Sequence, residues 1–101
     1  MQIASFQNKA TENIYSCKPA KGISLKLQRV ARRKIRHIEA ASVLSDLKSP
    51  PGNRLEKLKD HRAGQYSIRV NDRYRIYFEF LDDKAHNVEF VDYHDENRRG
   101  R

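Results

Sequence analysis

The chain has 101 residues, which is at the lower end of the usual single-domain range, so we expect residues 1–101 to form one domain. Its 21 Lys and Arg against 13 Asp and Glu give a formal net charge of +8, which favours nucleic acid as the partner. The alternative partners are an acidic protein and an anionic membrane. The charge could also serve only to keep the protein soluble. A single cysteine, no long apolar run and no signal-peptide pattern argue against a disulfide framework, a membrane span and export, so we expect a cytoplasmic protein.

The first half of the chain is predicted to hold a short strand and two helices. Residues 2–6 alternate polar and apolar side chains, and residues 11–17 fit a short helix. Ser24 is a plausible N-cap for a longer helix over residues 25–41, where apolar residues recur at three- and four-residue steps. A second face of this helix is basic and consists of Lys26, Arg29, Arg33 and Arg36. Such a run is usually the solvated side of a helix, although four cations without an intervening acid are less ordinary.

In the second half of the chain the apolar pattern changes from helical to alternating. One more helical turn at residues 43–47 is ended by Pro50 and Pro51. The alternation predicts strands over residues 66–70, 74–80 and 88–93, with turns at residues 71–72 and 82–84. The expected fold class is therefore α+β, with two main N-terminal helices packed on a small, mainly antiparallel sheet. Residues 95–101 are expected to form a frayed tail.

The expected pairing of the first two strands brings two arginines together. If Ile68 pairs with Ile76, then Arg69 lies directly opposite Arg75 on the other face of the sheet. Like charges in that arrangement are destabilising unless a negative group lies between them. A bound phosphate would supply it, and the alternative is that Glu79 or Glu89 neutralises the pair.

Residues around the predicted meander supply the side chains that RNA cleavage without a metal requires. Such cleavage needs a base for the 2′ hydroxyl, cations for the phosphate and an acid for the leaving oxygen. The segment before the meander is rich in cations and holds a histidine, and it comprises Arg54, Lys57, Lys59, His61 and Arg62. The meander ends in Asp92, Tyr93 and His94. These residues could equally be an ordinary strand end with its polar groups hydrogen-bonded and His94 merely exposed. The carboxylates are scattered among cations, so we expect no metal and no other cofactor.

Several blocks of the sequence resemble HigB-type toxins of the RelE superfamily, the plasmid maintenance killer proteins. The blocks are residues 49–56, 58–59, 62–72, 74–76 and 91–94, and they recur in the same order and spacing. The resemblance implies a RelE-like fold and ribosome-dependent cleavage of messenger RNA in the decoding site. It also implies neutralisation by a small HigA-type helix-turn-helix antitoxin encoded beside the toxin.

The resemblance also implies roles for single residues. Arg75 matches an arginine expected to hold the scissile phosphate, and Lys59 matches a basic residue expected to support it. The closing segment of the active site corresponds to Asp92, Tyr93 and His94, with His94 a candidate for proton transfer. Further cations are expected to bind RNA, and these are Arg54, Lys57, Arg62, Arg69 and Arg73.

The chain departs from the family pattern at positions that bear on these roles. Some relatives have histidine where Glu56 stands, so the base could differ, and His61 might substitute for it. Asp60 and His61 replace a usual Gly-Asp pair, and Tyr74 replaces a common tryptophan. Strict alternation also places His94 on the sheet face opposite to that of Arg75, so the strand must twist or break for both to reach one phosphate.

Two other functions fit the same residues. The chain could be a non-catalytic RNA- or ribosome-binding module that uses its basic face. It could also serve chiefly as the antitoxin-binding subunit of a DNA-binding repressor complex. No helix-turn-helix signature occurs in this sequence, so DNA would be contacted only through the antitoxin.

Overall fold

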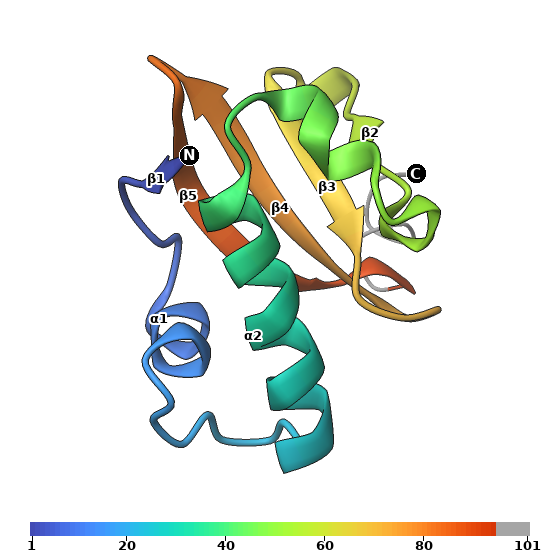
Figure 1. Ribbon diagram of the computed structural model, residues 1–101. Helices are drawn as coiled ribbons and strands as arrows, with labels where there is room; N and C mark the ends of the chain where they lie inside the picture. The colour runs from blue at the N-terminus through green and yellow to red at the C-terminus, as the bar shows by residue number, and fades with distance from the viewer. Residues whose placement is uncertain (95–101) are drawn as a thin grey trace.

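The computed structural model describes residues 1–94 as two helices packed on one face of a five-stranded sheet (Figure 1). The strand order is β1-β5-β4-β3-β2, and only β1 runs parallel to its neighbour, so the predicted α+β class is confirmed. The main elements are α1 (Lys9–Tyr15), α2 (Leu25–Ala40), β1 (Gln2–Ile3), β2 (Glu56–Lys57), β3 (Gln65–Arg69), β4 (Tyr74–Leu81) and β5 (Lys84–Asp92). Three 3₁₀ helices join them, namely η1 (Leu44–Lys48), η2 (Pro51–Asn53) and η3 (Asp60–Arg62). The expected tail, residues 95–101, lies outside the described residues.

Side-chain caps fix where both α-helices begin. Asn8 precedes α1, and its Oδ1 accepts hydrogen bonds from the backbone N of Thr11 at 2.9 Å and from the Thr11 hydroxyl at 2.7 Å. This cap starts the helix two residues earlier than predicted. Ser24 caps α2 as expected and accepts a hydrogen bond from the backbone N of Leu27 at 3.2 Å. Within residues 1–94, no helix combines the length and the apolar character that crossing a membrane requires.

The meander of β3, β4 and β5 has the predicted register between its first two strands. Ile68 pairs with Ile76, and Arg69 lies opposite Arg75. β5 begins earlier than predicted, at Lys84, because Asp82 and Asp83 both adopt positive φ and close a two-residue turn. The two-residue strand β2 extends the sheet beyond β3 and was not predicted.

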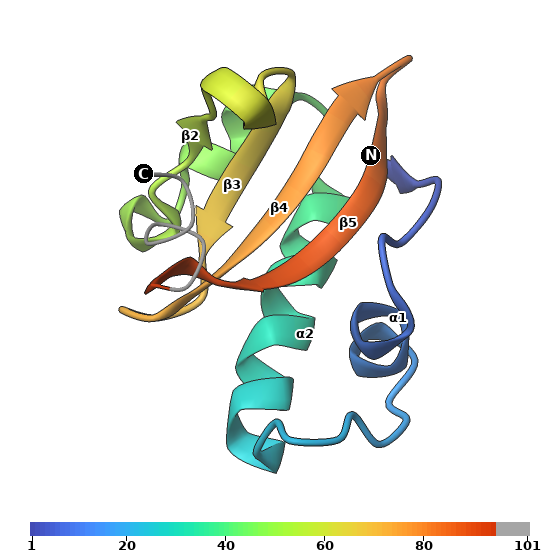
Figure 2. The same cartoon turned by 180° about the vertical axis from the view of Figure 1, so that it is seen from behind.

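The helices bury the apolar face of the sheet. Ile14 of α1 and Ile35 of α2 are fully buried, as are Ile68, Ile76 and Phe78 of the sheet. Burial of each such side chain contributes about 1.5–3 kcal/mol to folding. Because side chains alternate along a strand, those adjacent in sequence to this core point to the opposite face of the sheet. That face is turned toward the viewer in Figure 2, where the sheet lies in front of α2.

The N-terminal segment covers the outer edge of β5. β1 pairs with the start of β5, and three backbone hydrogen bonds of 2.8–3.0 Å join residues 4–7 to residues 85–88. The hydroxyl of Thr11 accepts a further hydrogen bond from the backbone N of Phe90 at 2.9 Å. The predicted strand over residues 2–6 is therefore shorter than expected, with an isolated parallel bridge between Phe6 and Val88 after it.

Candidate functional site

Arg75 lies at the centre of the sheet face that faces away from the helices. Its side chain is 11% exposed, and Nη1 donates a hydrogen bond to Oγ of Ser67 at 3.1 Å. The same Nη1 lies 3.8 Å from Oε2 of Glu56, which belongs to the added strand β2. Ser67 pairs with Glu56 in the sheet, so the two groups that hold Arg75 come from adjacent positions on neighbouring strands. The Arg75 guanidinium is thereby fixed in orientation.

Tyr93 completes the surroundings of this guanidinium. The Cζ atom of Arg75 lies 4.6 Å from the centroid of the Tyr93 ring, which is a cation–π contact. The chain leaves β5 after Asp92 and enters a helical turn at Tyr93. The expected break in the strand is therefore present, and it brings Tyr93 to Arg75. The His94 side chain makes no such contact among the described residues and is exposed.

Arg62 and Arg69 lie on the same face as Arg75. Arg62 reaches the sheet from η3, where its Nη1 lies 3.2 Å from Oε1 of Glu89 and its Cζ lies 4.8 Å from the Tyr77 ring centroid. Arg69 forms an ion pair with Asp72 in the turn between β3 and β4. The proposed alternative in which Glu79 or Glu89 neutralises the opposed arginines is wrong, because Glu56 contacts Arg75 and Asp72 contacts Arg69 instead.

The residues Arg73 and Asp92 form an exposed pair at the end of the sheet. Nη2 of Arg73 lies 2.9 Å from Oδ2 of Asp92, and Nε donates to the same oxygen at 3.0 Å. The other oxygen of Asp92 accepts a hydrogen bond from the backbone N of His94 at 3.1 Å. Asp92 therefore fixes the start of the final turn that carries Tyr93 and His94.

The remaining predicted site residues lie along the segment that leads to β3. Lys59 precedes η3 and is exposed, and His61 lies within η3. Arg54 has a positive φ of 47° at the end of η2. Lys57 pairs with Tyr66, so alternation places it on the opposite face of the sheet from Arg75. Among residues 1–94, no three His, Cys, Asp or Glu side chains lie close enough together to hold a metal ion.

Ser67 has a site role that the sequence reasoning did not assign. The register placed Ser67 opposite Tyr77, one diagonal step from Arg75, and long side chains reach diagonal neighbours in a sheet. That diagonal relation was the signal that could have identified it. Glu56 was recognised only as the position where relatives have histidine, because a two-residue strand gives no periodicity.

A buried polar cluster anchors the segment that carries Glu56. Nζ of Lys34 donates to Oδ1 of Asn53 at 2.7 Å, and Nδ2 of Asn53 donates to the carbonyl oxygens of Leu47 and Ser49, each at 3.2 Å. Burial lowers the pKa of Lys34, and the nearby charges of Arg33 and Arg69 act in the same direction. The cluster ties η1 and η2 to α2, and β2 follows directly after η2.

His37 lies one helical turn from Lys34 and has a perturbed pKa. Burial is the main cause that lowers its pKa, the charges of Lys34 and Arg33 add to it, and the Asn53 side chain opposes it. Its Nδ1 atom is buried without a hydrogen-bond partner among the described residues. The fold therefore favours the neutral form of this imidazole.

Comparisons of the sequence with known proteins show the family to which the chain belongs. A family model described as "RelE-like toxin of type II toxin-antitoxin system HigB" matches residues 4–94. Toxin HigB-1 of Vibrio cholerae is 38% identical over 90 residues, which cover 88% of this chain and 94% of that protein. An uncharacterized protein of Haemophilus influenzae is 38% identical over 71 residues, covering 70% of this chain and 69% of that protein.

A solved structure shares the fold at low sequence identity. The YoeB-YefM complex from Staphylococcus aureus contains a chain that matches with a TM-score of 0.55 and 16% identity, covering 90% of this chain and 99% of that one. At this identity the match supports the fold alone.

Proposed function

Because this chain belongs to the family of RelE-like HigB toxins of type II toxin-antitoxin systems, we propose that it is an endoribonuclease that cleaves messenger RNA on the ribosome and so inhibits translation. The observation that most strongly supports this is the fixed guanidinium of Arg75. Its Nη1 is held by Ser67 and Glu56, while its other N–H groups donate to no group among the described residues. Those donors are available for the oxygens of a phosphate.

The proposed reaction is attack by a ribose 2′ oxygen on the adjacent phosphorus. A bond forms between phosphorus and the 2′ oxygen, and the bond to the 5′ oxygen breaks, which leaves a 2′,3′-cyclic phosphate and a 5′ hydroxyl. Arg75 stabilises the added negative charge, with Lys59 in support, so the charge needs no metal ion. Glu56 is the carboxylate in contact with Arg75, and it accepts the proton of the 2′ hydroxyl.

The leaving 5′ oxygen needs a proton in return. His94 donates it in this proposal, because it follows Tyr93 on the turn that Asp92 fixes beside Arg75. His61 on η3 is the second candidate for this role. Arg62 and Arg69 flank Arg75 on the sheet face, and together with Arg54 and Arg73 they are proposed to bind the RNA backbone. Lys57 lies on the other face of the sheet and is not included.

The proposal also includes two partners, the ribosome, on which cleavage takes place, and an antitoxin that binds the toxin. The decoding site aligns the 2′ hydroxyl with the phosphorus, so free RNA is cleaved weakly and translated message strongly. A HigA-type helix-turn-helix antitoxin binds the toxin in the cytoplasm and supplies any contact to DNA. The solved YoeB-YefM complex supports an antitoxin partner for a toxin of this fold.

Primer extension on a translated message tests the proposal. Purified protein added to translating ribosomes is expected to create new 5′ ends within the reading frame, and far fewer when ribosomes are omitted. Arg75→Ala should abolish these ends, whereas Lys48→Ala, a change at an exposed lysine of η1, should leave them unchanged. Salt-sensitive binding to ribosomes without any new end would instead establish a non-catalytic binding module.

A further inference from the structure

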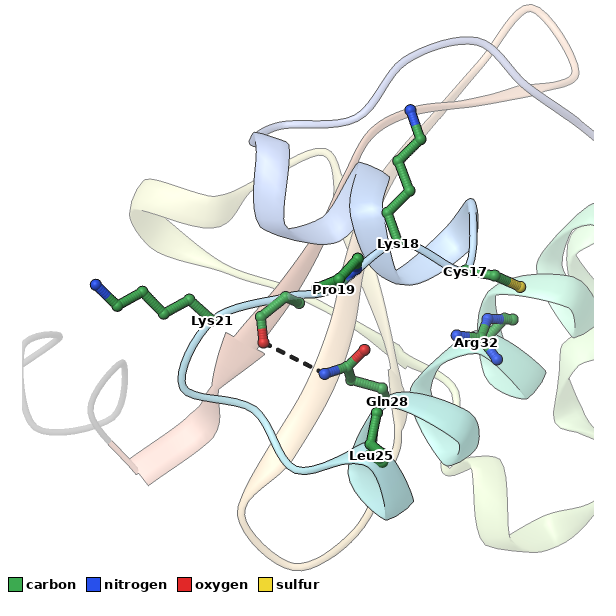
Figure 3. Close-up of a pocket in the computed structure, with 8 residues that line it drawn as sticks. Cys17, Lys18, Pro19, Lys21, Leu25, Gln28 and Arg32 are labelled. Carbon is green, nitrogen blue, oxygen red and sulfur yellow. Dashed lines mark hydrogen bonds between the residues drawn. The ribbon is translucent and has the colours of Figure 1, made fainter.

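A shallow depression of about 500 Å³ lies where the connection between α1 and α2 meets the first turns of α2 (Figure 3). Its volume is within the range of about 300–1,000 Å³ that is usual for small-ligand sites. Residues 17–21 line it from the connection, and α2 contributes Leu25, Gln28 and Arg32. None of these residues belongs to the Arg75 face, so the proposed RNA cleavage does not use this surface.

Arg32 supplies an oriented guanidinium at this depression. Its Nε donates a hydrogen bond of 2.7 Å to the carbonyl oxygen of Ile14 in α1, which fixes the side chain. Its two terminal amino groups form no hydrogen bond and no ion pair among the described residues. Residues 13–38 contain no Asp or Glu, so no carboxylate of this segment competes for them. Two neighbouring amino groups of an arginine bind the two oxygens of one anionic group side by side.

Two lysines raise the positive potential around Arg32. Lys18 and Lys21 are exposed, and in Figure 3 they extend away from each other toward solvent. Neither forms an ion pair with any residue from 1 to 94. Exposed, flexible cations of this kind attract an anion over a distance but do not fix its position. The position of the anion is therefore set by Arg32.

The depression also has an apolar surface. Leu25 is 70% exposed, more than any other large apolar side chain among the described residues. Pro19 and Ala20 of the connection line the same depression. An exposed leucine side chain is stabilised when another apolar group covers it and removes it from water. The surface therefore fits a ligand that carries an apolar group beside its anionic group.

Gln28 adds a fixed hydrogen-bond acceptor. The residue is 4% exposed, and its Nε2 donates to the carbonyl oxygens of Ala20 at 3.3 Å and Ile23 at 2.7 Å. These two bonds hold the amide in one orientation. Its Oε1 accepts no hydrogen bond from the described residues, and in Figure 3 it points away from Ala20, to the side on which Arg32 lies. This oxygen is available for an N–H group of the ligand.

We infer that this depression binds the C-terminus of a polypeptide whose last residue is apolar. The α-carboxylate pairs with the terminal amino groups of Arg32, and the last side chain packs on Leu25. The backbone N–H of the last residue donates to Oε1 of Gln28. A free C-terminal residue carries these three groups on one Cα atom and its attached atoms, so it matches all three features at once. The inference goes beyond the proposed function and does not depend on RNA cleavage.

Other anions match only part of this surface. An aliphatic acid has a carboxylate and an apolar chain but no N–H group, so it leaves the largely buried oxygen of Gln28 without a partner, which is costly. Inorganic phosphate, or a phosphate of a nucleic acid, pairs with Arg32 but leaves Leu25 exposed to water. These two classes of ligand are therefore the comparison probes of the experiment.

Cys17 provides the measurement, because it is the only cysteine of the chain, is exposed and lines the depression. A bound ligand is expected to slow alkylation of its thiol by N-ethylmaleimide. The rate is followed by mass spectrometry at increasing concentrations of N-acetyl-Gly-Ala-Leu with a free carboxylate. The comparison probes are the same peptide with a C-terminal amide, hexanoate and inorganic phosphate. Shifts of the Gln28 side-chain amide in nuclear magnetic resonance spectra give a second measure of binding.

The peptide with the free carboxylate is expected to bind at least tenfold more tightly than its amide, hexanoate or phosphate. Arg32→Lys keeps the charge but loses the paired amino groups, and Leu25→Gln removes the apolar contact at an exposed position. Each variant should bind the peptide at least fivefold more weakly. The control is Arg33→Gln, which removes a charge from the next, exposed residue of α2 and should leave binding within twofold. Circular dichroism confirms that all three variants are folded.

Several outcomes would overturn the inference. These are equal affinity for the acid and the amide, unchanged affinity in both Arg32→Lys and Leu25→Gln, or no protection of Cys17 and no Gln28 shift up to the solubility limit of the peptide. Hexanoate binding as tightly as the peptide would identify a site for small acids instead, and equal binding of phosphate would identify a general anion site. The assay contains neither ribosomes nor RNA, so a failure of the proposed cleavage would leave its result unaffected.

Discussion

The guanidinium carbon of Arg75 lies 4.6 Å from the centroid of the Tyr93 ring. Such a contact contributes about 0.5–2 kcal/mol and depends on the face of the ring and not on its hydroxyl. We therefore expect Tyr93→Phe to cleave within about threefold of the wild-type rate and Tyr93→Ala to be about tenfold slower. Single-turnover cleavage on translating ribosomes measures both. A phenylalanine variant as slow as the alanine variant would instead assign the hydroxyl a part in the reaction.

Glu56 is expected to act as the base, and replacing it tests whether its carboxylate, and not only its size, is needed for cleavage. Glu56→Gln keeps the size of the side chain but cannot accept a proton, so cleavage should slow by about 10²–10⁴-fold. Glu56→His should restore much of the rate, because relatives that this chain resembles have histidine there. A fully active glutamine variant would rule out Glu56 as the base.

The buried contact between Lys34 and Asn53 predicts a large loss of stability when it is broken. Asn53→Ala removes the acceptor of a buried ammonium group and two further hydrogen bonds, so the free energy of unfolding should fall by about 2–4 kcal/mol. Adding Lys34→Met removes the unpaired charge and should recover part of that loss. Urea unfolding of the two variants gives the comparison. If the double variant is no more stable than Asn53→Ala, the burial of the charge is not the cause.

The lowered pKa of His37 predicts that acidification destabilises the fold. Because burial lowers this pKa in the folded state, the unfolded chain takes up the proton at a higher pH than the folded chain does. The stabilisation is therefore complete above the unfolded pKa of about 6.5 and is lost as the pH falls below it. Between pH 7.5 and 5.5, the melting temperature of the wild type should therefore drop further than that of His37→Gln.

The control for this prediction is a second histidine. His86 lies near the start of β5, where its Nε2 lies 3.1 Å from the carbonyl oxygen of Leu81. His86→Gln should keep the wild-type difference in melting temperature between the two pH values. Identical pH profiles for the wild type and His37→Gln would show that another group causes the acid sensitivity.

Local patterns in the sequence predicted the helices and strands whose own residues show a clear apolar period. Alternation gave β3 and β4 and their register, because a slip of one residue would have moved Ile68 and Ile76 out of the core. The periodicity and the Ser24 cap likewise predicted α2. The start of α1 was placed too late because Asn8 was not recognised as the N-cap, whose Oδ1 accepts hydrogen bonds from both the backbone N and the hydroxyl of Thr11.

The partners of the site residues depend on contacts between distant segments, which no local pattern contains. The opposition of Arg69 and Arg75 was predicted correctly, but Glu56 contacts Arg75 from β2, which pairs with β3 and follows the segment that Asn53 anchors to Lys34 of α2. The stacking of Tyr93 on Arg75 depends on the turn after β5. The catalytic roles assigned to the site residues stay predictions until cleavage is measured.

The arrangement of the N-terminal segment along β5 also affects how the protein behaves in a crowded cell. A long strand with unpaired backbone groups invites another molecule to extend the sheet, which is a route to aggregation. Residues 4–11 form hydrogen bonds with backbone groups on the outer edge of β5. The other edge of the sheet is β2, which is only two residues long. Neither border offers enough free backbone for another chain to align, so newly made copies are protected from forming extended β-assemblies.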